Sequence, residues 1–223
     1  MSILFVLLTF LIVIVASYYF RREHQPAAVK AESRPWLVPL TPSMMKEQGF
    51  DIPKDYCFHP GHTWVLDEGH ENARIGIDSL ASHLLGSVDR VELVGLNRWV
   101  RQGQKVCTLV ADGMPVDVLS PVEGVVLSVN REALRDPGLI AKDPYRTGWI
   151  CVVKAPELAT NTRNLIRGSL VTAWMQNSLR RLGTLTSQLA PAMAADGGLP
   201  VAGLLSKLEP TVQRSVIQEF FLT

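Results

Sequence analysis

The amino-acid sequence predicts a mainly β fold, in which a small barrel or sandwich module is joined to an N-terminal apolar helix and to C-terminal helices. Three observations support this prediction. Residues 56–154 contain short apolar runs of strand length, separated by turns rich in Gly and Pro, as in small all-β domains. Residues 3–20 form one uncharged apolar segment. Residues 159–223 contain apolar side chains at helical spacing.

The predicted strands lie close together in the central region. The apolar runs occupy residues 62–66, 73–77, 87–94, 105–110, 116–119, 124–129 and 149–153. One short helix is expected over Asp78–Leu85, because Asp78 suits the N-cap position and Gly86 suits the end of a helix. The remaining connections are short and contain turn residues, which favours a compact antiparallel module.

Residues 1–22 are predicted to be a transmembrane anchor that contacts the lipid bilayer through residues 3–20. A helix over residues 3–20 would be about 27 Å long, close to the roughly 30 Å core of a bilayer. A cleaved signal peptide is the alternative, but it would carry basic residues before the apolar run and a small-residue cleavage site after it. Here Tyr18, Tyr19, Arg21 and Arg22 surround the end of the run, and no basic residue precedes it. The positive-inside rule then predicts a single-pass membrane protein with its module on the cytoplasmic side.

The segment that follows, residues 23–55, is predicted to be a Pro-rich tether. It contains Pro26, Pro35, Pro39, Pro42 and Pro53. Repeated prolines interrupt both helices and strand ladders, so we expect a semi-extended connection and not a domain.

Composition argues against several classes of function. Hydrophobic residues make up 47% of the chain, charged residues 19%, and the formal net charge is +1, so no basic surface for nucleic acid is expected. Cys57, Cys107 and Cys151 are odd in number and widely spaced, which favours a reducing compartment over a disulfide framework. Nucleotide-binding, serine-hydrolase and zinc-protease motifs are missing from the sequence, so we expect a protein that is not an enzyme.

Four segments of the central region stand out as an ordered set. They are Phe58-His-Pro-Gly-His-Thr-Trp64, Ile75-Gly-Ile-Asp-Ser-Leu-Ala81, Ser120-Pro-Val-Glu-Gly124 and Ala141-Lys-Asp-Pro-Tyr145, the last followed by Gly148-Trp149. In this order and at similar spacing, they resemble the signature segments of the glycine-cleavage H proteins. The resemblance implies a barrel-sandwich module of the biotinyl/lipoyl type over residues 56–158. It also implies a lipoyl-lysine at a hairpin tip, eight residues before the proline of one turn.

The position implied for the lipoyl-lysine holds a glycine. Counting eight residues back from Pro121 reaches Gly113, within the segment Asp112–Met114. Glycine has no amine that could be acylated, and no lysine lies between Lys105 and Lys142. Asp-Gly is itself a favourable hairpin turn. We therefore expect Gly113, with Asp112 and Met114 beside it, to keep the turn without the chemistry, and we expect no cofactor.

Cys57, His59 and His62 form the sequence's weak candidate for a metal site. The pattern Cys-x-His-x-x-His offers three possible ligands. It lacks a second pair of ligands at a recognisable spacing, and His62 already belongs to the resemblance. A structural role is therefore favoured for these residues, and no metal is expected.

The C-terminal extension, residues 159–223, is expected to contain an amphipathic helix over 161–189 and another over Pro210–Phe221. Packing of the apolar stripes inside the protein is the favoured interpretation. The alternatives are a docking surface for a protein partner and a helix in the membrane plane. Three functions follow from the sequence as a whole. The expected one is a membrane-anchored, non-lipoylated interaction or scaffold subunit of a membrane-associated complex. The alternatives are a lipoyl or biotinyl carrier that uses a non-standard lysine, and an adaptor of a secretion or efflux assembly.

Overall fold

The computed structural model describes residues 43–189 and 200–223 of the chain. Residues Thr41–Thr223 form one compact unit. The predicted membrane anchor lies outside the described residues, as does most of the predicted tether. Within residues 43–189 and 200–223, every helix is too short or too polar to cross a bilayer.

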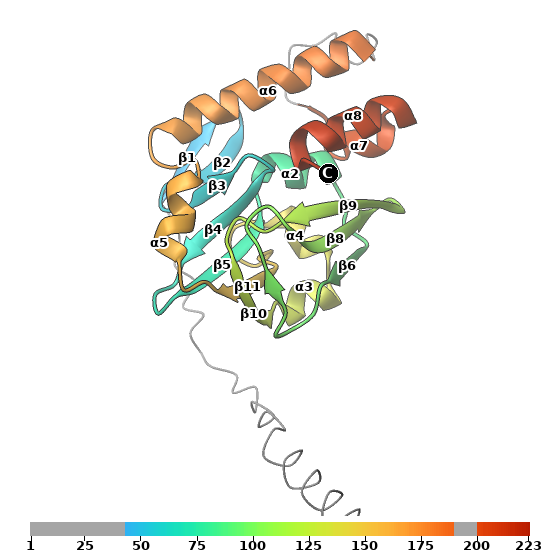
Figure 1. Ribbon diagram of the computed structural model, residues 1–223. Coiled ribbons are helices and arrows are strands. Elements are labelled where there is room, and N and C mark those ends of the chain that lie inside the picture. Colours follow the sequence, from blue (N-terminus) through green and yellow to red (C-terminus); the bar gives the residue numbers. More distant parts are fainter. Residues whose placement is uncertain (1–42, 190–199) are drawn as a thin grey trace, which may run out of the picture. The chain divides into compact units, whose positions relative to one another are not determined.

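The core module is built from two antiparallel sheets, as the sequence predicts (Figure 1). Side chains from both sheets enter one hydrophobic core. The larger sheet has the order β3 (Cys57–His59), β4 (Thr63–Asp67), β5 (Asn72–Ile77), β11 (Cys151–Lys154), β10 (Gly124–Val129) and β7 (Trp99–Val100). The smaller has the order β6 (Arg90–Leu93), β8 (Lys105–Ala111) and β9 (Met114–Leu119).

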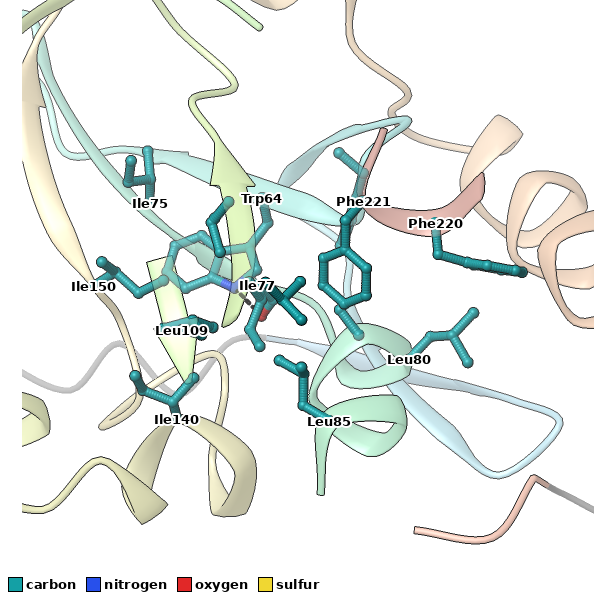
Figure 2. Close-up of a cluster of buried hydrophobic side chains, with 14 of the residues drawn as sticks. Trp64, Ile75, Ile77, Leu80, Leu85, Leu109, Ile140, Ile150, Phe220 and Phe221 are labelled. Atoms are coloured by element: carbon teal, nitrogen blue, oxygen red, sulfur yellow. Dashed lines mark hydrogen bonds between the residues drawn. The ribbon is translucent and has the colours of Figure 1, made fainter. Parts of the chain in front are cut away.

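Trp64 lies at the centre of this core and is fully buried. Its indole Nε1 donates a hydrogen bond of 2.7 Å to the carbonyl oxygen of Ile77, so the polar end of the ring is satisfied. Gly76 faces the ring, and a Cβ there would lie 2.6 Å from Trp64 Cζ2. Figure 2 shows Trp64 among aliphatic side chains from both sheets and from the adjoining helices. The missing side chain at position 76 is what allows the indole to fit.

Short helices join the strands. The predicted helix is α2 (Ser79–Leu85), and the side chain of Asp78 caps it by accepting a 2.8 Å hydrogen bond from the amide of Ala81. Two one-turn helices, α3 (Arg131–Arg135) and α4 (Gly138–Lys142), fill the connection between β10 and β11.

The end of the predicted tether is a folded hairpin, which corrects the expectation for residues 44–53. Strands β1 (Met44–Glu47) and β2 (Phe50–Pro53) pair in antiparallel register around Gln48-Gly49. Phe50 and Ile52 alternate with exposed Asp51 and are buried against the rest of the module. The prolines do not prevent pairing, because Pro42 precedes the hairpin and Pro53 is its last strand residue.

The C-terminal extension is helical but begins differently from the prediction. Instead of one helix from residue 161, the chain forms α5 (Leu158–Asn161), the 3-10 turn η1 (Thr162–Asn164) and then α6 (Leu170–Leu189). The break has a cause: Ile166 exchanges two 2.8 Å backbone hydrogen bonds with Phe58 at the edge of the larger sheet. After residue 200 come α7 (Leu204–Lys207) and α8 (Pro210–Phe221).

Candidate functional site

The hairpin between β8 and β9 places Gly113 at an exposed tip. Ala111 is paired with Met114, so only Asp112 and Gly113 form the loop. Their φ angles are +48° and +75°, the two positive values that define a type I′ turn. Both residues are exposed, and a Cβ built on Gly113 would meet nothing within 4 Å. The tip therefore has room for a side chain, although its backbone favours glycine.

The tip is held from the neighbouring strand. Asp89, just before β6, donates its amide to the carbonyl oxygen of Val110 at 2.7 Å. Its carboxylate accepts a 3.3 Å hydrogen bond from the amide of Gly113. Met114 is half-buried and packs against the core. These contacts give the loop a defined position, and neither of its two residues, Asp112 and Gly113, carries an amine.

The turn that contains Pro121 is also held by hydrogen bonds. Ser120 is completely buried, its amide donates to Gln104 O at 2.8 Å, and its carbonyl accepts from Gly103 at the same distance. Between Gly113 and Pro121, β9 pairs residue by residue, and the register shift in this ladder falls between Lys105 and Cys107 on β8. The spacing of eight residues thus corresponds to one regular strand that runs from the turn to the hairpin tip.

Of the lysines nearest in sequence, Lys105 lies at the far end of the same hairpin, and Lys142 and Lys154 lie on other elements. Lys105 begins β8 and lies six strand residues from Ala111, a distance of about 20 Å. Its ammonium is 2.9 Å from the carboxylate of Asp117. Lys142 ends the one-turn helix α4. Lys154 ends β11, with its ammonium 3.6 Å from Glu71.

The predicted metal candidates point to different partners. The amide of Gly61 donates a 3.0 Å hydrogen bond to Nδ1 of His59, and burial lowers the pKa of that imidazole. Burial raises the pKa of the Cys57 thiol, which disfavours the thiolate that a metal would need. Nδ1 of His62 lies 2.7 Å from the carboxylate of Asp78. In the part of the chain that the structure describes, no cluster of three His, Cys, Asp or Glu side chains could hold a metal ion.

His62 is instead part of a buried cluster that sequence reasoning did not identify. Its ring stacks on Trp174 of α6, with centroids 4.7 Å apart, and lies 5.4 Å from the ring of Phe220 in α8. Asp78 holds the imidazole with one carboxylate oxygen and caps α2 with the other. Beside the cluster is a cavity of about 240 Å³, lined among others by Ser178 of α6. The pairing of His62 with Asp78 depends on the register of β4 with β5, which no local sequence pattern reveals.

The apolar stripes of the C-terminal helices face inward, as the favoured interpretation of intramolecular packing predicts. Figure 2 shows Phe221 pointing into the core near Leu80 and Leu85 of α2. The carbonyl oxygen of Phe221 lies 3.4 Å from where a Cβ on Gly61 would be. Of the three interpretations, intramolecular packing is the one that the structure shows. The buried stripe residues are Val171, Met175 and Leu182 of α6 and Val212, Val216, Phe220 and Phe221 of α8.

Comparison with known proteins agrees with the segments described above. The profile of the glycine cleavage H-protein family matches residues 56–178, more than half of the 223-residue chain. The glycine cleavage system H protein of Thermus thermophilus is 35% identical over 108 residues, which cover 48% of this chain and 84% of that protein. The probable glycine cleavage system H protein 1 of Saccharolobus solfataricus is 30% identical over 122 residues, which cover 55% of this chain and 89% of that protein. A crystal structure of the Mycobacterium marinum H protein aligns with a TM-score of 0.44 and 29% identity, covering 47% of this chain and 87% of that one. The chain belongs to the glycine cleavage H-protein family.

Proposed function

We propose that this chain is a membrane-anchored H-protein-like subunit that acts by binding and positioning other proteins, without a lipoyl group. One observation carries the proposal: the hairpin tip that resemblance assigns to the lipoyl-lysine holds Gly113 in a tight Asp-Gly turn. A carrier needs a primary amine on a flexible stem at this tip, where a modifying enzyme and then distant active sites can reach it. The family's shape is retained here and its reactive group is missing.

A carrier that uses another lysine has less support. Lys105 is about 20 Å down the strand from the tip and lies within ion-pair distance of Asp117. Lys142 and Lys154 belong to other elements of the module. None of the three sits at the apex of a hairpin, the geometry that gives a swinging arm its reach. The secretion or efflux adaptor draws its support from the sequence alone, through the anchor followed by a module of lipoyl type.

The membrane part of the proposal rests on the sequence. Residues 3–20 contain no charged side chain and are long enough for a bilayer core. Basic residues follow the run and none precedes it, which favours a module on the cytoplasmic side. With the anchor, the module would work at a membrane surface, beside whichever complex it serves.

Intact-mass measurement of the protein purified from its own host tests the proposal. We expect the mass of the unmodified chain. A lipoylated H protein produced in the same cells serves as the control, because its mass gain shows that the modifying enzymes are active. A lipoyl or biotinyl mass gain on this chain, mapped to any lysine, would restore the carrier. Resistance of the chain to carbonate extraction from membranes tests the anchor separately.

A further inference from the structure

An exposed apolar patch lies on β7, on β10 and on the turn that precedes β7. In Figure 1, β10 lies at the end of the module that is opposite α6. We name it the Trp99 patch: Leu96, Trp99 and Leu127, whose exposed fractions are 51%, 51% and 41%. Exposed large apolar side chains that gather in one place usually mark a contact surface. Trp99 and Leu127 lie on paired strands, and Leu96 lies in the turn that leads into β7.

The backbone shows why these side chains point outward together. Trp99 of β7 pairs with Val125 of β10. Because the next residue, Val100, is buried and successive side chains of a strand alternate, the indole of Trp99 points to the outer face of the sheet. Between Val126 and Ser128, β10 shifts register against β11. Leu127 is the extra residue of this β-bulge, and its side chain is exposed. The loop that carries Leu96 is fixed by two backbone hydrogen bonds of 2.9 Å: the amide of Asn97 donates to the carbonyl of Val126, and the amide of Val126 donates to the carbonyl of Arg98.

Two arginines accompany the patch. Arg98 and Arg101 are on either side of Trp99 in the sequence, and both are exposed. Among residues 43–189 and 200–223, neither guanidinium has a carboxylate within ion-pair distance. The backbone amide of Arg101 donates a 3.0 Å hydrogen bond to the side chain of Gln104, which fixes the main chain while the guanidinium stays in solvent.

We propose that the Trp99 patch is a contact surface for a phospholipid bilayer that contains anionic lipid. Trp is favoured at membrane interfaces, because its ring is apolar and its N–H is polar. Leu side chains can enter the acyl boundary, and Arg side chains are attracted to anionic headgroups. The patch combines these three features within one short stretch of chain and its strand neighbour. A protein partner would find the same side chains, but the two unpaired positive charges beside the indole favour a phosphate-rich surface.

The inference rests on the proposed membrane anchor, which makes a weak surface sufficient. Residues 21–42 join the apolar segment to the described module, and fully extended they span at most about 75 Å. A module held so close to a bilayer meets it at an effective concentration on the order of millimolar. Three apolar side chains and two arginines are too few to hold a free protein on a membrane, but they can orient one that is already attached.

The experiment uses the full chain reconstituted in vesicles, with a fluorescent dye at Leu127→Cys and bromine-labelled phospholipid as the quencher. Cys57→Ser removes the half-buried native thiol, while Cys107 and Cys151 are buried. The matched control is a dye at Leu170→Cys, because Leu170 is 65% exposed at the start of α6, away from the patch. We expect several times more quenching at position 127 than at 170 when the vesicles contain anionic lipid.

Charge substitutions sharpen the test. Each arginine near an anionic surface changes membrane partitioning by roughly fivefold. The double substitution Arg98→Gln with Arg101→Gln should therefore strongly lower the quenching of the dye at position 127, whereas Arg180→Gln on α6 should not. Equal quenching at positions 127 and 170 would overturn the inference. Shielding of the position-127 dye from aqueous iodide in native membranes, without quenching by lipid, would also overturn it and indicate a protein partner. Carbonate extraction of the chain would contradict the anchor and with it the proposed function, whereas equal quenching at both positions in a carbonate-resistant chain would contradict the patch alone.

Discussion

Replacing Phe221 by alanine should destabilise the whole module, because this side chain is a structural part of the core. Phe221 ends α8, is only 1% exposed and points among α2 residues in Figure 2. Truncation of a buried Phe to Ala removes its burial energy and leaves a cavity, at a cost of about 3–5 kcal/mol. We therefore expect the free energy of unfolding of the Phe221→Ala variant to fall by that amount.

Urea unfolding of the full chain in mild detergent provides the assay. The burial of Trp64 and the half-burial of Trp174 make intrinsic fluorescence a suitable signal. With a slope of about 2 kcal/mol per molar urea, the midpoint should fall by roughly 1.5–2.5 M. Leu222→Ala is the matched control, since Leu222 is adjacent in sequence but 48% exposed, and its change should stay within about 0.5 kcal/mol.

The opposite result would refute the reasoning. If Phe221→Ala and Leu222→Ala had the same small effect on the urea midpoint, α8 would not contribute to the core. Docking of a protein partner by the C-terminal helices would then be favoured over packing of these helices in the core. A large shift in both variants would instead show that the end of α8 is sensitive to any truncation, so that burial does not explain the result.

Two further substitutions and one labelling experiment test other parts of the fold. Gly76→Ala should destabilise the protein by at least about 1–3 kcal/mol in thermal unfolding, because the new Cβ would lie 2.6 Å from the ring of Trp64. Gly113→Ala meets no neighbour, so it should cost only the roughly 1 kcal/mol of a left-handed backbone, and an equal loss at both glycines would contradict the packing argument. Iodoacetamide at pH 8 should modify Cys57 before Cys151 in the folded protein, because burial raises the pKa of the Cys151 thiol to about 12 and removes it from solvent. Mass mapping of early modification at Cys151 would show that this part of the core opens.

The local features of the fold could be predicted from the sequence because each has a short-range physical cause. Alternating apolar residues define most of the strands, and Asp78 caps α2 as its residue type suggests. The Asp112-Gly113 pair specifies the tight hairpin on its own. For these features, the information lies within a few residues of the structure that it determines.

The features that were missed depend on contacts between distant segments. The β1–β2 hairpin contains Phe50 and Ile52 in strand alternation, but the prolines around it dominate the composition of the segment. The break before α6 results from pairing of Ile166 with Phe58, more than one hundred residues earlier. Such pairings can be recognised only when the strand order is known. The overall composition of a segment hides the few side chains, such as Phe50 and Ile52, that determine its structure.

The H-protein part and the C-terminal extension are one structural unit, and His62 shows this most clearly. This histidine belongs to the family's signature segment, yet its ring packs between Trp174 and Phe220, which lie beyond residue 158. The predicted boundary after residue 158 therefore cuts through a shared core, in agreement with the single compact unit Thr41–Thr223. A module trimmed at that boundary would expose His62, the carboxylate of Asp78 and the apolar surface beneath Phe221. The extension therefore completes the fold of this family member, because its inward side chains cover the signature segment that contains His62.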